Sequence, residues 1–208
     1  MRRTYDAVAE RYAVAVDREL DHRPLERALL AALPELAGLD DSPGIVADLG
    51  AGPGHVARHL REIGLPTVAV DLAPAMVAVA RHRNGVPAAA GSLTALPLAS
   101  SSVAAAVVLF AWIHLTDDEL AAAAAELHRV LRPGGVAVIS FHVGDEVVHL
   151  DEWHGHAVDI DFRFLQPGAV TAGLAAAGLR VEATLERAAI PDLEAPTRRC
   201  YLVARRPR

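Results

Sequence analysis

The stretch "GIVADLGAGPGHVARHL", Gly44 to Leu60, decides the fold of this chain. An apolar run ends in Asp48, three glycines follow at alternate positions from 50 to 54, and a helical pattern begins at Val56. Glycines between a strand and a helix allow a tight turn and let a ligand approach the backbone closely. The stretch therefore predicts a ligand-binding loop between a buried strand and a helix.

The carboxylate of Asp48 limits what this loop can hold. Dinucleotide-binding enzymes hold a pyrophosphate on a G-x-G-x-x-G turn, whereas the spacing here is G-x-G-x-G. An acid beside a pyrophosphate would bring like charges together in a partly dry site, which is unfavourable. S-adenosylmethionine carries an ammonium and a sulfonium and no phosphate, so the charge favours this cofactor. The alternative is a glycine-rich turn that binds nothing.

A second acid, Asp71, directly follows the next apolar run, Thr67 to Val70. A carboxylate at the end of this strand can accept hydrogen bonds from the ribose hydroxyls of an adenosine. The alternative is that Asp71 caps the helix expected to begin near Pro74, and the two roles are compatible. The pair of acids predicts a nucleoside-containing, cationic ligand.

Strands and helices alternate through the first two thirds of the chain. Strands are expected at 45–49, 67–70, 88–90, 103–110 and 136–140, and helices at 56–63, 74–83 and 117–131. Residues from about 5 to 36 read as two helical pieces. Short loops between strand–helix–strand units predict an α/β fold with a doubly wound, mostly parallel sheet and helices on both faces. We expect one domain over residues 1–208, with residues 1–36 as an N-terminal helical cap.

The later part of the chain departs from this alternation. Residues 141–165 are rich in histidine, acids and aromatics and show no clear period, so we expect an irregular substrate lid. A helix is expected near 167–177, and strands near 179–185 and 199–204. Because no helix separates these last two strands, they should pair antiparallel.

Composition excludes several classes of partner. The 208 residues are 52% hydrophobic with a net charge of −6 and no run of like charges, so neither nucleic acid nor an anionic membrane is expected as a partner. No window reaches the roughly 18 apolar residues of a membrane span. The lack of an apolar signal segment after Met1 points to the cytoplasm. The single cysteine, Cys200, excludes an internal disulfide and should be buried in a late strand.

In these motifs the chain resembles the class I S-adenosylmethionine-dependent methyltransferases. The resemblance is to the small bacterial kind related to the ubiquinone-biosynthesis type (methyltransferase type 11). The resemblance spans almost the whole chain and implies a Rossmann-like α/β/α sandwich whose seven-stranded sheet has its last strand antiparallel. The segments that carry it are "YDAVAERYA", "VADLGAGPGHVARHL", "VAVDLAPAMVAVAR", "GSLTALPLASSSVAAAVVLFAWIHL", "ELHRVLRPGGVAVISF" and "RRCYLVARR".

The resemblance also implies roles for the loop residues. It places the glycine loop at the methionine end of the cofactor, Asp71 at the ribose and Ser92–Leu93 at the adenine. Many relatives have Asp where this chain has Ser92 and another acid where it has Ala104, so adenine recognition would rest on backbone atoms or hydroxyl contacts. The residues expected to bind the cofactor are Tyr5, Tyr12, Asp48, Gly50, Ala51, Gly52, Pro53, Gly54, Asp71, Leu72, Met76, Ser92, Leu93 and Phe110.

The tyrosines among these residues come from the N-terminal helices. Tyr5 and Tyr12 are seven residues apart and share one helical face. In similar enzymes this segment folds over the cofactor; the alternative is core packing against the edge of the sheet.

Aromatic residues indicate where an acceptor would bind. Six of the nine aromatics fall at the ends of the fourth and fifth strands or in the expected lid, as a concave apolar pocket requires. Phe110 is one of these six aromatics and is already among the residues expected to bind the cofactor. The other five are the expected substrate-binding residues: Trp112, Phe141, Trp153, Phe162 and Phe164. His114 and His142 occupy the same rim, and each is a candidate general base, with a structural role as the alternative.

The irregular stretch after His142 also raises a metal hypothesis. Its histidines and acids are His149, Asp151, Glu152, His154, His156 and Asp159. Their spacing fits no standard metal site, so we expect no metal and favour a polar lid.

Three functions are therefore open. The first is transfer of a methyl group from S-adenosylmethionine to an oxygen, nitrogen or carbon nucleophile of a small molecule by direct in-line displacement. A nicotinamide-dependent oxidoreductase is disfavoured by Asp48 and the glycine spacing. A non-catalytic cofactor-binding protein would keep the loop but would need no aromatic pocket.

Overall fold

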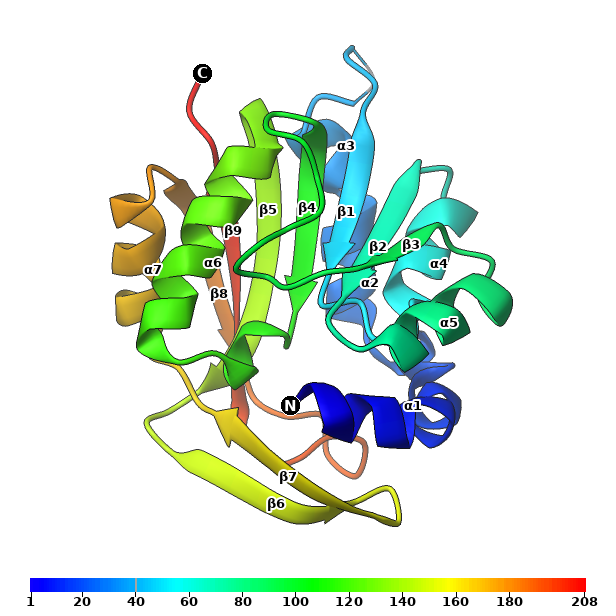
Figure 1. Ribbon diagram of the computed structural model, residues 1–208. Helices are drawn as coiled ribbons and strands as arrows, with labels where there is room; N and C mark the ends of the chain where they lie inside the picture. The colour runs from blue at the N-terminus through cyan, green and yellow to red at the C-terminus, as the bar shows by residue number, and fades with distance from the viewer. Residues whose placement is uncertain (40) are drawn as a thin grey trace.

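Parallel strands form the middle of the computed structural model, which describes residues 1–39 and 41–208 (Figure 1). The seven-stranded sheet has the order β3-β2-β1-β4-β5-β9-β8, and β9 is antiparallel to both of its neighbours. The strands are β1 (Ile45–Leu49), β2 (Thr67–Asp71), β3 (Ala88–Ala90), β4 (Val103–Leu109), β5 (Leu131–Val143), β8 (Arg180–Arg187) and β9 (Arg198–Arg205). The doubly wound α/β fold with one antiparallel strand is confirmed, as is the burial of Cys200 in β9.

Helices bury both faces of this sheet. On one face lie α2 (Pro24–Ala31), α3 (Leu33–Leu36), α4 (His55–Glu62) and α5 (Pro74–His82), and on the other lie α6 (Asp117–Val130) and α7 (Pro167–Ala176). In β4, Ala105 and Val107 point toward the first group, whereas Ala106 and Val108 point toward α6. Burial on both faces explains why β4 reads as an unbroken apolar run rather than an alternating one.

Helix α6 begins where the sequence indicates. Thr116 accepts a hydrogen bond from the Glu119 N–H, and the Glu119 carboxylate accepts one from the Thr116 N–H at 2.8 Å. This reciprocal pair is a capping box, which satisfies two backbone donors at the helix start.

The N-terminal part has more pieces than the two helices expected. It consists of α1 (Arg2–Val16), a short 3-10 helix (Glu19–His22), α2 and α3. Pro24 occupies the first turn of α2, and Pro34 occupies the first turn of α3. A proline without a backbone N–H is tolerated at a first helical turn, so each proline restarts the chain in a new direction.

Strand β5 is longer than its apolar core. It begins at Leu131 rather than Val136, and Pro133-Gly134-Gly135 lies inside it. Leu131 pairs with Val103, and Val136 pairs with Ala105, so the register shifts across the Pro-Gly-Gly stretch. The turn expected before the strand is therefore a bulge within it.

The segment 141–165 is regular, contrary to our expectation. Beyond the end of β5 it forms an antiparallel hairpin of β6 (Val147–Trp153) and β7 (His156–Arg163). The two turn residues, His154 and Gly155, both have positive φ (50° and 71°), as two-residue hairpin turns require. The two faces of β7 differ, because Val158 and Phe162 pack against core clusters and Ile160 is 3% exposed, whereas Asp159 and Asp161 on the other face are exposed. The stretch "VDIDFR", 158–163, therefore carries an apolar–polar alternation typical of a strand, which the sequence analysis did not use.

Helix α1 and this hairpin lie at the same end of the sheet, where the arrowheads of β1 and β4 end in Figure 1. The apolar side of α1 packs on α5 through Val8, Ala13, Met76 and Val79. Over the described ranges, the model contains no helix that combines the length and the apolar character needed to span a bilayer.

Gly54 gives a test of the turn into α4. Its φ is +81°, and an added Cβ would lie 2.9 Å from the Ala80 Cβ, whereas Gly64 has φ +92° and open space around it. We expect Gly64→Ala to cost about 1–2 kcal/mol for left-handed backbone alone, and Gly54→Ala to cost roughly 1–3 kcal/mol more through the clash. Urea unfolding of the two variants measures the difference, and equal losses would contradict the close packing of this turn on α5.

Candidate functional site

A cavity of about 280 Å³ opens at the carboxyl ends of β1, β2, β4 and β5. In this position the crevice of an open α/β sheet meets the loops that follow its strands. Sixteen of the expected site residues line it: Tyr5, Tyr12, Asp48, Gly50, Ala51, Gly52, Pro53, Asp71, Leu72, Ser92, Leu93, Phe110, His114, His142, Trp153 and Phe162. The structure thus brings the glycine loop, the second acid and both candidate histidines to one place.

Five expected residues lie away from this cavity. Gly54 is the N-cap of α4, and Met76 is fully buried between α1 and α5. Trp112 and Phe141 are buried in the core between the sheet and α6. Phe164 lines a second cavity beside α7, together with Trp112. The expected gathering of six aromatics around one pocket therefore holds for Phe110, Trp153 and Phe162 only.

Asp71 connects the glycine loop to the start of α5. Its carboxylate accepts hydrogen bonds from the Gly52 N–H and the Ala73 N–H, each at 2.8 Å. Burial raises its pKa above the usual value, and the two N–H donors oppose this change. Each carboxylate oxygen keeps further lone pairs, so the capping role is compatible with binding a ligand.

Asp48 is the most deeply buried acid of the loop, with 3% of its surface exposed. It accepts one hydrogen bond, from the Ala57 N–H at 3.0 Å. Burial raises its pKa to about 7, while the charge of His55 and the Ala57 N–H act in the opposite direction. Near neutral pH this carboxyl is thus poised between its two forms, and a bound cation would favour the ionised one.

His114 is held by hydrogen bonds on both ring nitrogens. Nδ1 lies 2.9 Å from the Asp161 carbonyl oxygen, which can only accept, so Nδ1 carries the proton. Nε2 then accepts from the Tyr5 hydroxyl at 2.7 Å. Burial lowers the pKa of His114 to about 4, so the ring is neutral at physiological pH. Its contacts tie α1 to β7, which supports the structural alternative for this residue.

Trp153 completes this connection between α1 and the hairpin. Its ring centroid lies 5.5 Å from that of Tyr5, 5.1 Å from that of Tyr12 and 5.6 Å from that of Phe162. Such aromatic pairs contribute roughly 0.5–1.5 kcal/mol each beyond area burial. Together the tyrosines and the hairpin cover the cavity.

His142 is the candidate base with one ring nitrogen available. Its Nδ1 lies 2.8 Å from the Thr197 hydroxyl, and Nε2 makes no hydrogen bond in the part of the chain that the structure describes. Burial lowers its pKa to about 4, and the nearby charges of Arg199 and Arg23 lower it further. The ring packs on Phe110 with centroids 4.9 Å apart. His142 is therefore a neutral, cavity-lining imidazole at neutral pH.

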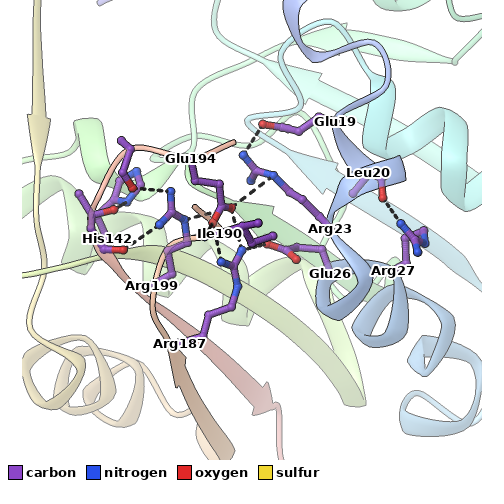
Figure 2. A network of polar contacts seen from close by, with 12 residues as sticks. Glu19, Leu20, Arg23, Glu26, Arg27, His142, Arg187, Ile190, Glu194 and Arg199 are labelled. Carbon is purple, nitrogen blue, oxygen red and sulfur yellow. Dashed lines mark hydrogen bonds and ion pairs between the residues drawn. The ribbon is translucent and has the colours of Figure 1, made fainter. Parts of the chain in front are cut away.

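A network of buried charges beside His142 escaped the sequence analysis (Figure 2). Glu194, in the β8–β9 loop, binds both terminal nitrogens of Arg187 at 2.6 and 2.8 Å. It also lies 3.3 Å from the Nε of Arg199 and 3.5 Å from the Nε of Arg23. Salt bridges and backbone contacts hold the pKa of Glu194 down at about 2. Arg23, Glu26 and Arg199 line the cavity.

One sequence signal could have placed Arg199 in this network. Because β9 runs antiparallel to β5, its first residues lie at the same edge as the carboxyl end of β5. Arg199 pairs directly with His142 in that register. The sequence analysis expected β9 to pair antiparallel with β8, but it did not place β9 beside β5.

One histidine of the hairpin is paired with an acid. His149 and Asp161 lie 2.8 Å apart and are both exposed. Within residues 1–39 and 41–208, no group of three or more potential ligands is arranged to hold a metal ion.

The fold and the site define a class: a Rossmann-like sheet with a glycine loop and two acids at a nucleoside-sized cavity. Comparison with known proteins agrees. A model of the methyltransferase domain family matches residues 46–135. The chain is 32% identical over 201 residues to a malonyl-[acyl-carrier protein] O-methyltransferase of Enterobacter lignolyticus, covering 91% of this chain and 74% of the relative.

Two further proteins are similar to the chain, one in part of its sequence and one in its fold. An uncharacterized methyltransferase of Mycobacterium bovis is 42% identical over 102 residues, which cover 49% of this chain and 41% of that protein. A methyltransferase structure from Methanosarcina mazei superposes with a TM-score of 0.71 at 12% identity, covering 78% of this chain and 92% of that one. The chain belongs to the S-adenosylmethionine-dependent methyltransferase family. This membership removes the nicotinamide oxidoreductase alternative.

The raised pKa of Asp48 predicts a pH-dependent effect on stability. The folded protein holds this proton up to about pH 7, whereas an unfolded Asp releases it near 3.8. The stability that Asp48 contributes is thus fully present below about pH 4 and is lost as pH rises to 7. We expect Asp48→Asn, which cannot ionise, to unfold at a higher temperature than wild type at pH 8, by several degrees.

Thermal melts of both proteins from pH 5 to 8 test this expectation. The difference in melting temperature should grow with pH and level off above about pH 7. A difference that stays constant over this range would show that Asp48 is ionised throughout.

Proposed function

We propose that this methyltransferase transfers the methyl group to an oxygen or nitrogen nucleophile of a small-molecule acceptor. The observation that carries the proposal is one cavity with two unlike halves. The first half has the glycine loop and Asp71, and the second has Phe110, His142 and Phe162. A cofactor and an acceptor side by side would fill such a cavity.

The first half fits the charges of S-adenosylmethionine. Asp48 complements its positive groups, and the backbone of Gly50 and Gly52 allows close approach, since both glycines have positive φ. Asp71 would accept hydrogen bonds from the ribose, with Leu72 beside it, and Ser92 and Leu93 would contact the adenine.

The second half would align the acceptor. S-adenosylmethionine supplies an activated methyl group, so the chain's own task is to hold the nucleophile in line and exclude water. Phe110, Phe162 and Trp153 would provide apolar contact. The neutral His142 imidazole could accept a proton from an attacking hydroxyl or amine, because its Nε2 is available. His114 is engaged on both nitrogens, so its role would be to hold α1 in place.

Residues 1–36 and 141–165 would act as a cap and a lid. Tyr5, Tyr12 and Trp153 meet above the cavity, and these contacts must separate for ligands to exchange. This arrangement is typical of segments that sequester a reaction from water.

A product assay tests the proposal. Purified protein with S-adenosylmethionine is offered a malonyl thioester, both free and on acyl carrier protein because of the Enterobacter relative, together with small acids, amines and phenols. Mass spectrometry detects the methylated acceptor and S-adenosylhomocysteine. Methylation of free small molecules supports the proposal, whereas methylation of the carrier-bound thioester alone would reject a small-molecule acceptor.

Asp71 should determine cofactor affinity. We expect Asp71→Asn to weaken S-adenosylmethionine binding by about 1–3 kcal/mol, because a charged acceptor of hydrogen bonds becomes neutral. Calorimetry gives the affinity, and a thermal melt checks that the loop contacts to Gly52 and Ala73 survive. Unchanged affinity in a folded variant would remove Asp71 from the ribose site.

Trp153 should matter more to the acceptor than to the cofactor. We expect Trp153→Ala to raise the acceptor KM about tenfold, the equivalent of one or two aromatic contacts. Trp153→Phe serves as the matched control because it keeps an aromatic ring. Equal losses of cofactor and acceptor binding in the Ala variant would show that the hairpin only supports the fold.

A further inference from the structure

Arg199 is a buried cation whose hydrogen bonds go to neutral groups. Its side chain is 3% exposed, and its terminal nitrogens donate to the carbonyl oxygens of Thr197 at 2.7 Å and Ala195 at 3.2 Å. Its Nε has no hydrogen-bond partner in the described ranges, although Glu194 lies 3.3 Å away. Buried charges are almost always paired by hydrogen-bonded counter-charges, so this arrangement is unusual.

The nearby carboxylates are already engaged by Arg187. Both oxygens of Glu194 accept from Arg187, and one of them also accepts from the Ile190 N–H at 2.7 Å. Glu26 accepts from Arg187 at 2.6 Å and from the Tyr201 hydroxyl. Arg187 therefore has two hydrogen-bonded carboxylates and does not line the cavity. Arg199 lines the cavity and has no hydrogen-bonded carboxylate in the described residues.

The place of Arg199 in the sheet puts it on the acceptor side of the cavity. It is the direct cross-strand neighbour of His142, whose ring packs on Phe110. The glycine loop and Asp71 follow β1 and β2, on the other side of β4 in the strand order. A negative group in the acceptor half would thus meet Arg199 rather than the cofactor loop.

We propose that Arg199 binds a carboxylate of the acceptor, so that the enzyme selects carboxylate-bearing small molecules. Each terminal nitrogen of Arg199 keeps one N–H beyond its carbonyl bond, and a guanidinium presents such donors in a fork that matches a carboxylate. The inference rests on the proposed function, because it concerns the acceptor of that reaction. It adds to the proposed function that the acceptor must carry a negative charge.

A purely structural role for Arg199 makes a different prediction. Its two bonds to Thr197 and Ala195 also hold the β8–β9 loop against the cavity. Lysine keeps the positive charge but lacks the fork that reaches both carbonyls. Arg199→Lys therefore separates charge from loop support, and Arg199→Gln removes the charge.

The test measures malonate binding to the complex with S-adenosylhomocysteine by calorimetry. For wild type we expect malonate to bind and the neutral malonamide to bind at least tenfold more weakly. Arg199→Gln should weaken malonate binding at least tenfold, and Arg199→Lys should recover part of it. The matched control is Arg198→Gln, which removes one charge at the next position, where the side chain is 67% exposed and paired with Glu186.

Each outcome decides the proposal. Equal binding of malonate and malonamide by wild type, no binding of malonate, or equal losses in the Lys and Gln variants would overturn it. A thermal melt checks that each variant is folded, and a folded Arg199→Gln protein that no longer binds S-adenosylhomocysteine would assign Arg199 to the cofactor and would also overturn the proposal. If a variant is misfolded, the wild-type comparison of malonate with malonamide decides. If wild type methylates only neutral or cationic acceptors, the proposed function stands and this inference fails; if it methylates nothing in the assay above, the proposed function fails as well.

Discussion

The two hydrogen bonds that Asp71 accepts hold the site together. One comes from the Gly52 N–H of the glycine loop and the other from the Ala73 N–H before α5. A single side chain at the end of β2 thus fixes the loop after β1 and the start of the next helix. The Gly50 and Ala51 N–H groups also donate to the Val70 carbonyl oxygen, so Asp71 adds a side-chain link between a loop that is already tied to β2 and the start of α5. The Asp71 carboxylate that organises the loop is the same group that we propose binds the ribose hydroxyls.

Burial of ionisable groups is the second constraint on this protein. Asp48 and Arg199 are each nearly inaccessible to solvent, and neither has a hydrogen-bonded counter-charge in the described residues. Desolvating a charge costs free energy that only a partner of opposite sign recovers. Both groups line the cavity, at opposite sides of β4. The cost in stability is therefore concentrated where ligands can offset it, as is common when a protein trades stability for function.

The sequence predicted the sheet well because its strands are buried on both faces and joined by short loops. Runs such as 45–49 and 67–70 could hardly be placed elsewhere, and Asp48 and Asp71 were found because they lie at the carboxyl ends of these runs. The hairpin of β6 and β7 was missed although residues 158–163 of β7 alternate between apolar and polar, because the more exposed β6 has no such pattern and the many acids and histidines suggested an irregular segment. Trp112 and Phe141 were misplaced because an aromatic at a strand end can point into the core as easily as into the crevice.

The charged network was missed for another reason. Its members come from α2, the β8–β9 loop and the two last strands, so no local motif contains more than two of them. Pairing across the sheet brings Arg199 to His142, and only three-dimensional packing brings Glu26 to Arg187. A contact between residues about 160 positions apart cannot be predicted from the spacing of residues in the sequence.

The contact between Tyr5 and His114 determines how the covering segments respond to the solvent. The hydroxyl and the neutral imidazole form a hydrogen bond without net charge, and the rings of Trp153 and Tyr12 beside it are also uncharged. Salt screens interactions between charges and leaves such contacts almost unaffected. At this contact, closure of α1 over the cavity should therefore be insensitive to ionic strength, whereas the ion pair of Asp17 with Arg58 at the other end of the helix is screened by salt. Separation of Tyr5, Tyr12 and Trp153 exposes aromatic surface, so ligand exchange would carry the heat-capacity signature of apolar surface.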